Sequence, residues 1–156
     1  MKVANIFILI GFGLIFFQCR KEEVDDQKPA IDSNYTEAFP KACDTLYIGE
    51  YFIFKSHFTD NEAIGSYSLD IHNNFDHHSH STEAATCSLD PVKQAINPLI
   101  YLENFSFAKG LKSYYTNDSI YIPMGVDAGD YHFHIAVTDQ TGWQSIKIFS
   151  VKILER

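Results

Sequence analysis

The histidines are the residues of this sequence best suited to chemistry. Of seven in the chain, four fall within the nine residues 72–80, and two more alternate along residues 132–134. Imidazole nitrogens combined with a carboxylate form the ligand set that zinc and copper prefer in proteins. A solvated polar loop is the alternative explanation for such a cluster. The metal interpretation therefore depends on whether the fold brings the two groups of histidines together.

Alternation of apolar and polar residues predicts the strands that position these histidines. In residues 63–72, one face is expected to carry Tyr67, Leu69 and Ile71, and the other Ser68, Asp70 and His72. In residues 129–139, the inward face is expected to carry Tyr131, Phe133, Ile135 and Val137. His132 and His134 then lie on the outward face of this second strand.

Short alternating runs separated by turn residues predict an all-β fold for residues 42–156. About seven strands in a domain of this length indicate an immunoglobulin-like antiparallel β-sandwich. Tyr131 stands near the start of the sixth expected strand, at the position of a tyrosine corner, in which the hydroxyl binds backbone a few residues upstream.

The expected topology joins the two groups of histidines. In an immunoglobulin-like sandwich the third and sixth strands are antiparallel neighbours, so His72 is expected beside His132. The loop after His72 leaves the same edge of the sheet and can fold back over its outward face. The sequence therefore predicts one metal site with the candidate ligands His72, Asp76, His78, His80, His132 and His134. Zinc or copper is the expected ion, because calcium would leave the imidazoles unused.

The N-terminus has the features of a signal peptide. Lys2 precedes fifteen residues, 3–17, of which one is polar, and a membrane-spanning helix needs roughly twenty. The residues before Cys19 resemble a bacterial lipobox, with Phe16 and Gln18 where that pattern favours leucine and a small residue. We therefore expect residues 1–18 to be a lipoprotein signal peptide and Cys19 to be lipidated. An uncleaved membrane anchor is the alternative.

Residues 19–41 are polar and acidic without a sustained period, so they are expected to form a flexible tether. The residues RKEE after Cys19 resemble the lipoprotein export signal of Bacteroidetes. This resemblance implies a lipid anchor in the outer membrane, with the domain on the cell surface. A solvated charged linker is the alternative explanation of these residues. In such a location Cys43 and Cys87 are either bonded as a disulfide or remain two buried thiols.

Two motifs carry a resemblance to one family. The sequence DIHNNFD followed by HSH, together with GDYHFHIAVTDQTGW, is similar to uncharacterised Bacteroidetes lipoproteins grouped as domain of unknown function 4625. The resemblance covers residues 43–154, and its pattern falls on His72, Asp76, His78, His80 and His132. His77 stands where a small residue is expected in relatives. The resemblance implies an immunoglobulin-like fold and a lipoprotein address, and it implies no activity.

Net charge and the absence of certain sequence motifs limit the classes of function that fit this chain. A net charge of −8 disfavours nucleic acid as a partner, because phosphate binding needs a basic surface. The sequence has no phosphate-binding loop, dinucleotide fingerprint or nucleophile elbow, so we expect a binding module and not an enzyme. Three roles stay open: binding of a divalent transition metal, structural or adhesive binding of a protein or glycan partner, and a pH-sensitive contact.

Overall fold

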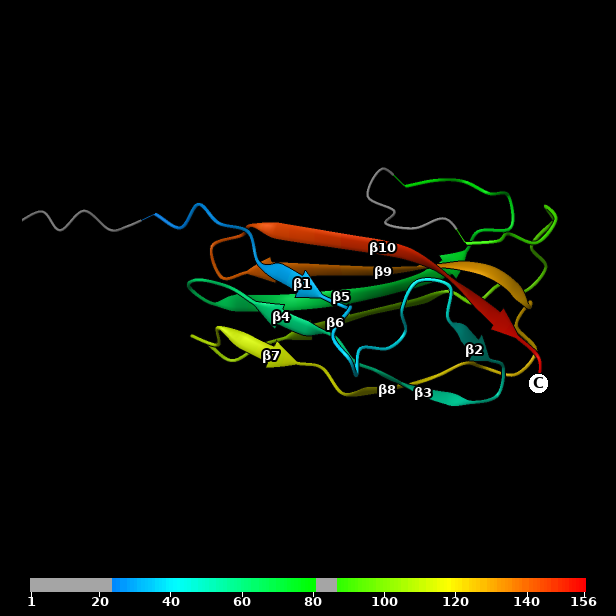
Figure 1. Ribbon diagram of the computed structural model, residues 1–156, viewed down its shortest axis with the longest axis horizontal. Helices are drawn as coiled ribbons and strands as arrows, with labels where there is room; N and C mark the ends of the chain where they lie inside the picture. Colours follow the sequence, from blue (N-terminus) through cyan, green and yellow to red (C-terminus); the bar gives the residue numbers. More distant parts are fainter. Residues whose placement is uncertain (1–23, 81–86) are drawn as a thin grey trace, which may run out of the picture.

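The computed structural model describes residues 24–80 and 87–156, and its elements within these ranges are strands alone (Figure 1). The strands are β1 (Ala30–Asp32), β2 (Thr45–Tyr47), β3 (Tyr51–Phe54), β4 (His57–Thr59), β5 (Ile64–Asn73), β6 (Tyr101–Ser106), β7 (Ser113–Tyr115), β8 (Asp118–Tyr121), β9 (Gly129–Asp139) and β10 (Gln144–Leu154). The expected all-β class is confirmed. The expected signal peptide and Cys19 lie outside the described residues, within which no helix is long and apolar enough to cross a membrane.

The strands form two layers of a sandwich (Figure 1). The larger layer is one five-stranded sheet in the order β2-β10-β9-β5-β6. The other layer contains the three-stranded sheet β1-β4-β7 and the two-stranded sheet β3-β8. The strands that carry the histidines, β5 and β9, are antiparallel neighbours inside the larger sheet, as the sequence predicts.

A local interruption accounts for two of the additional strands among the ten that are found, where about seven were expected. The pairings of β3 with β8 and of β4 with β7 follow one register, in which Ser56 and Thr116 lie opposite each other. Thr116 Oγ1 accepts a hydrogen bond from the Ser56 N–H at 2.7 Å and lies 3.2 Å from the Phe54 carbonyl oxygen. Because the Thr116 side chain takes the place of a backbone acceptor here, two longer strands are each divided in two.

The segment before β3 differs from the expected tether. β1 pairs antiparallel with β4, whereas β2 pairs in parallel with β10, so the chain crosses from one layer to the other between residues 32 and 45. Each short strand supplies backbone hydrogen bonds to a strand whose edge would otherwise be open. Part of the segment expected to be a tether, the strand β1, thus belongs to the sandwich. The pair of β2 with β10 is parallel, in a sandwich that was expected to be antiparallel.

The core agrees with the alternation seen in the sequence. The expected inward residues of β5 and β9 are all buried: Tyr67, Leu69, Ile71, Tyr131, Phe133, Ile135 and Val137. Between the layers, the rings of Phe133 and Phe54 stack with centroids 5.6 Å apart, and the Phe58 centroid lies 5.2 Å from that of Tyr67. The polar residues of β5 and β9 therefore occupy the opposite face of the larger sheet.

Tyr131 forms the tyrosine corner that the sequence predicts. Its hydroxyl donates to the Asp127 carbonyl oxygen at 2.6 Å and accepts a hydrogen bond from the Leu99 N–H at 3.1 Å. Burial raises the pKa of this hydroxyl above its ordinary value. The corner therefore ties the connection before β9 to the connection before β6.

Replacing Tyr131 by phenylalanine should lower the free energy of unfolding by about 1–3 kcal/mol, because a partly buried carbonyl oxygen and a buried N–H lose their partner. Urea denaturation of the two proteins measures this difference. The control is Tyr121→Phe, which removes a hydroxyl from a partly exposed ring and should change the value by less than about 0.5 kcal/mol. Equal losses in both variants would contradict the role of the corner.

Candidate metal centre

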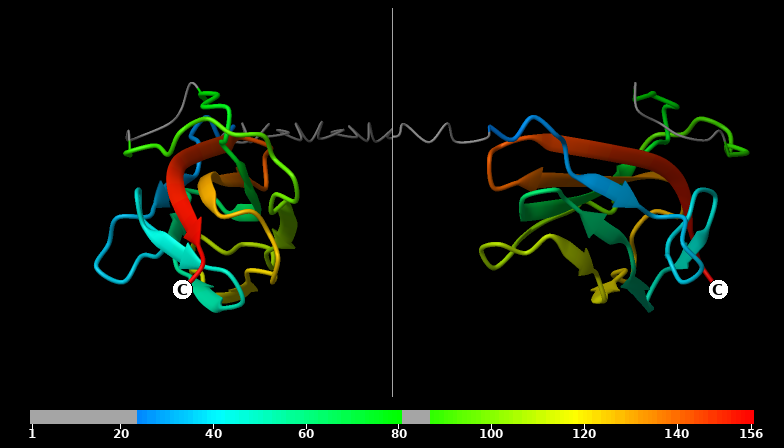
Figure 2. Two further views of the ribbon diagram at one scale, coloured as in Figure 1. Left: turned by 90° about the vertical axis from the view of Figure 1, so that its right-hand side faces the viewer. Right: turned by 60° about the vertical axis from the view of Figure 1, so that its left-hand side comes forward.

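The register between β5 and β9 brings the two groups of histidines together. His72 lies opposite His132, and Asp70 lies opposite His134. Side chains opposite each other in an antiparallel pair have Cβ atoms about 5 Å apart. The loop that follows β5, green in Figures 1 and 2, lies at the end of the sandwich where β5 ends and β9 begins. Histidines from this loop therefore meet histidines from the sheet.

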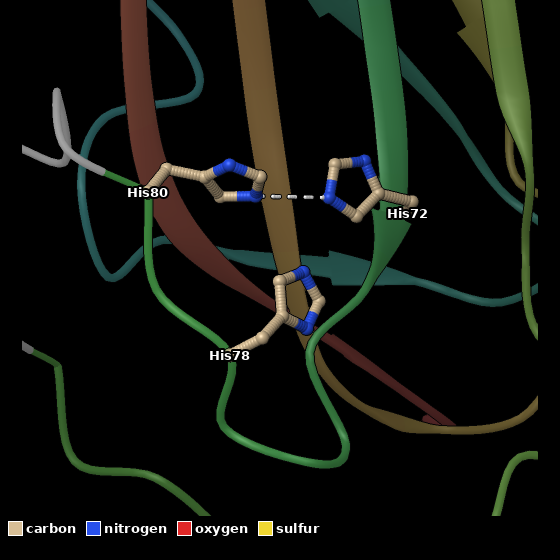
Figure 3. A group of neighbouring side chains, drawn as sticks. All are labelled: His72, His78 and His80. Carbon is tan, nitrogen blue, oxygen red and sulfur yellow. Dashed lines mark hydrogen bonds between the residues drawn. The ribbon is translucent and has the colours of Figure 1, made fainter.

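Three rings converge at this end of the sheet (Figure 3). His72 belongs to β5, His78 and His80 belong to the loop, and one ring nitrogen of each lies within 4.8 Å of the others. His72 Nε2 and His80 Nε2 are 3.3 Å apart. Two nitrogens that each lie about 2.1 Å from one tetrahedral zinc are about 3.4 Å apart. The separation of these two nitrogens therefore fits a shared ion.

Carboxylates orient two of the rings. Asp70 Oδ1 lies 2.9 Å from His72 Nδ1, and Asp76 Oδ1 lies 2.6 Å from His78 Nδ1. Because an ionised carboxylate only accepts hydrogen bonds, each Nδ1 carries the hydrogen and each neutral ring keeps its lone pair on Nε2. The bond to His78 also lowers the pKa of Asp76. Carboxylates in this position fix the tautomer and raise the basicity of metal-binding histidines.

His132 lies beneath the converging rings. It is fully buried, and its ring centroid lies 4.6 Å from that of His80 and 4.9 Å from that of His78. Its Nε2–H donates to the His78 carbonyl oxygen at 3.1 Å. His132 therefore holds the loop against the sheet.

His134 lies two residues further along β9, opposite Asp70. Its Nε2 is buried and has no hydrogen-bond partner among the described residues. Burial lowers the pKa of His134, the Asp70 carboxylate opposes this shift, and His80 and His72 add to it. His134 is therefore neutral at pH 7 and lies partly buried on the same face of β9 as His132.

Covalent and ionic contacts fasten the loop between β5 and β6 to the larger sheet. Cys43 and Cys87 form a disulfide, which decides between the two states that the sequence leaves open. Lys152 of β10 binds Asp90 at 2.7 Å and the buried Asp130 at 2.9 Å. The Asp90 N–H also donates to Asp130 Oδ2 at 2.7 Å. The histidine loop is thus attached to the sheet by β5 on its N-terminal side and by Cys87 and Asp90 on its C-terminal side.

The cluster has the donors that a divalent transition metal requires. Three imidazole nitrogens form the protein part of many zinc sites, and water or a further group takes the fourth position. The side chains of His72 and His78 are 24% and 37% exposed, so solvent reaches the site. The residues present fit Zn²⁺ or Cu²⁺, and an ion held there would be open to a second molecule.

The structure brings together ring nitrogens from three of the six predicted ligands. Of the others, Asp76 orients His78, and His132 and His134 lie underneath in the sheet. Asp70 orients His72, a role that the sequence does not single out. The signal was present, because an aspartate two residues before a histidine shares its face of a strand.

His77 stands apart from the cluster. Its φ is +59°, in the left-handed region, and its Nε2–H donates to the Asp90 carbonyl oxygen at 2.8 Å. Glycine and asparagine adopt this backbone conformation more readily than other residues. This geometry gives a physical reason for the small residue expected here in relatives.

The fold and the site define a β-sandwich domain with a histidine cluster at one end of its larger sheet. A family model described as a domain of unknown function (DUF4625) matches residues 17–154. The chain belongs to this family, in agreement with the resemblance of its two histidine motifs. A comparison with curated proteins finds no match.

Among solved structures, the chain is similar to a family 123 glycoside hydrolase from Clostridium perfringens. The two share 16% identity with a TM-score of 0.42, over 72% of this chain and 22% of the hydrolase. The chain thus spans about a fifth of the length of that protein. A likeness at this level supports no conclusion about the activity of this chain.

Proposed function

We propose that this domain binds a divalent transition metal, zinc or copper, through His72, His78 and His80, as a binding module and not as an enzyme. The observation that carries the proposal is the 3.3 Å separation of His72 Nε2 and His80 Nε2. The carboxylates behind His72 and His78 support it, because they leave Nε2 of both rings as the metal-binding nitrogen. The close nitrogens and the orienting carboxylates all belong to β5 and to the described part of the loop that follows it.

The same proposal places the domain on the outer membrane, held by lipid on Cys19 and exposed at the cell surface. The lipobox-like residues before Cys19 and the following RKEE support this location. The Cys43–Cys87 disulfide also supports it, because disulfides persist in exported proteins and are rare in the cytosol. Two or more acyl chains would give the stable anchoring that one chain does not.

Metal binding is tested by titrating the purified full chain, in detergent, with ZnCl₂ and with CuCl₂ in a calorimeter. We expect one ion per chain with a dissociation constant below about 1 μM, which corresponds to at least about 8 kcal/mol. The variant His72→Ala with His80→Ala should weaken binding at least 100-fold, because it removes both nitrogens of the closest pair. His132 is left intact because it is fully buried.

His57→Gln is the matched control for these titrations. His57 lies in the other layer, where its ring stacks on Tyr115 with centroids 3.9 Å apart. This variant should bind both metals as the native chain does. Micromolar or weaker binding that is the same in all three proteins would refute the proposal.

An adhesive module is the second candidate, and exposed aromatic rings favour it. Tyr51 and Tyr121 pair across β3 and β8 with ring centroids 4.8 Å apart, and Tyr51 is 70% exposed. Tyr51 also borders a hollow of about 400 Å³. Exposed tyrosines are common at contacts with protein and glycan partners. Binding to a glycan array that is lost in Tyr51→Ala and kept in the histidine variants would support this second function.

A further inference from the structure

A second group of potential ligands lies at the opposite end of the sandwich. Asp25 precedes β1, Asp60 follows β4 and Asp139 ends β9, and one carboxylate oxygen of each lies within 4.8 Å of the others. At about 3.3 Å per residue, this end of β9 is about 23 Å from His132. In Figures 1 and 2 the first described residues, in blue, run beside the turn between β9 and β10. We propose that these aspartates bind calcium and thereby fasten the N-terminal segment to the domain.

Asp139 provides the first independent observation that points to a cation. The residue is 4% exposed, and its Oδ1 accepts hydrogen bonds from the N–H groups of Thr141, Gly142 and Trp143 at 2.8, 2.6 and 2.9 Å. Its Oδ2 is buried and accepts no hydrogen bond from the described residues. A buried carboxylate oxygen without a partner is costly, and a bound cation would remove that cost.

Asp60 repeats this arrangement on the neighbouring turn. Its Oδ1 accepts hydrogen bonds from the N–H groups of Glu62 and Ala63 at 2.9 and 2.7 Å. Its Oδ2 is buried and also accepts none from the described residues. Two adjacent turns, between β4 and β5 and between β9 and β10, thus each hold one aspartate with one oxygen bonded and the other buried without a partner.

Asp25 brings the third carboxylate from the N-terminal segment. Its Oδ1 accepts hydrogen bonds from Asn61 Nδ2 at 2.9 Å and from the Gln27 N–H at 3.1 Å, and these bonds lower the pKa of Asp25. The Trp143 indole Nε1–H donates to the Asp25 carbonyl oxygen at 3.0 Å. The segment is therefore held in place with its carboxylate ionised at neutral pH.

The negative charge of the three aspartates favours the binding of a cation. In the part of the chain that the structure describes, the ion pairs formed by lysine and arginine involve other carboxylates. Lys112 Nζ binds the Asn61 carbonyl oxygen at 2.7 Å. Three carboxylates in such proximity repel one another, and a divalent ion would replace this repulsion with attraction.

The donor atoms select the ion. All three side chains offer oxygen, which suits hard cations, and none offers the nitrogen or sulfur that transition metals prefer. Ca²⁺ accepts six to eight oxygens in flexible geometry, whereas Mg²⁺ demands a near-ideal octahedron. Carboxylates from three separate parts of the chain fit the flexible geometry of Ca²⁺ more readily than the strict octahedron of Mg²⁺.

Calcium at this site would fix the orientation of the domain relative to its lipid anchor at Cys19. Asp25 is six residues from Cys19, so an ion shared by Asp25 and the two turns would hold this end of the sandwich next to the start of the mature chain. The histidines, at the far end of β9, would then face away from the anchor. This consequence rests on the proposed lipid at Cys19, whereas the calcium site itself does not.

Trp143 offers a direct measurement, because it is the single tryptophan of the chain and contacts Asp25. The full chain in detergent is titrated with CaCl₂ while its tryptophan fluorescence is recorded. We expect a saturable change with a dissociation constant of about 10⁻⁴–10⁻³ M, the range of extracellular calcium modules. Asp25→Asn and Asp139→Asn should each weaken binding at least tenfold, and Asp25→Asn carries the test if Asp139→Asn does not fold.

Glu103→Gln is the matched control, because it removes one exposed charge on β6 far from the cluster, and it should bind calcium as the native chain does. The variant His72→Ala with His80→Ala should also keep calcium binding, which separates this site from the histidine site. No saturable response up to 10 mM calcium, an equal response to MgCl₂, or unchanged binding in Asp25→Asn would overturn the inference.

Discussion

Replacing Cys43 and Cys87 together by serine is expected to lower the free energy of unfolding by about 4 kcal/mol, or at least about 3. The disulfide joins residues 44 apart in sequence. Opening it restores to the unfolded chain the freedom that closure of a loop of this length removes, and the chain-entropy model gives about 4 kcal/mol for that effect. Urea denaturation of the native chain and the double variant measures the difference.

Two further measurements separate the disulfide from the substitutions themselves. The native chain in excess reductant should unfold at the urea concentration of the double variant, because both lack the crosslink. Zinc affinity of the double variant should also fall, since Cys87 fixes one end of the loop that carries His78 and His80. A loss of stability below about 1 kcal/mol would show that the rest of the fold already restrains this loop.

The strands that carry the site could be predicted because their alternation is unbroken. Tyr67, Leu69 and Ile71 point inward on β5, as the apolar positions require, and this fixes the face on which Asp70 and His72 lie. The same reasoning holds for β9. With both faces assigned, the antiparallel pairing of the third and sixth strands was enough to place the first group of histidines beside the second.

Alternation of apolar and polar residues does not reveal which part of an outward sheet face a loop will cover. His132 and His134 lie on the polar face of β9, yet His132 is fully buried and His134 is partly buried. Opposite His132 on β10, Ser150 is buried as well. The loop after β5 folds over this end of the sheet, held by contacts with residues such as Lys152 that are distant in sequence. The contact of buried His132 with the loop backbone is therefore a feature that alternation along the strand could not predict.

The strand β1, inside the expected tether, was not predicted for a related reason. It has three residues, which is too short for a period to stand out from a polar segment. Its position depends on backbone bonds to β4, which the side chains do not indicate. The contact of Asp25 with the turn near Trp143 also joins residues more than a hundred positions apart, which local patterns cannot reveal.

Zinc is expected to raise the free energy of unfolding of the native chain by about 4 kcal/mol when free zinc is 1,000 times its dissociation constant. Its ligands come from the end of β5 and from the loop that follows, and the unfolded chain has no such preformed site. The measurement is urea denaturation at pH 7.5 in a zinc buffer and in EDTA. His80→Ala should reduce the difference to below about 1.5 kcal/mol, because a 100-fold weaker dissociation constant leaves free zinc at about 10 times that constant, whereas His57→Gln should keep the difference.

The dependence of this stabilisation on pH provides an independent test of the ligands. A metal binds the neutral form of imidazole, so binding of zinc by histidine ligands weakens as the pH falls. The stabilisation by zinc should therefore be complete near pH 7.5 and largely lost by pH 5. A zinc effect of equal size at both pH values would assign the ion to carboxylates in place of imidazoles, because carboxylates stay ionised throughout this range.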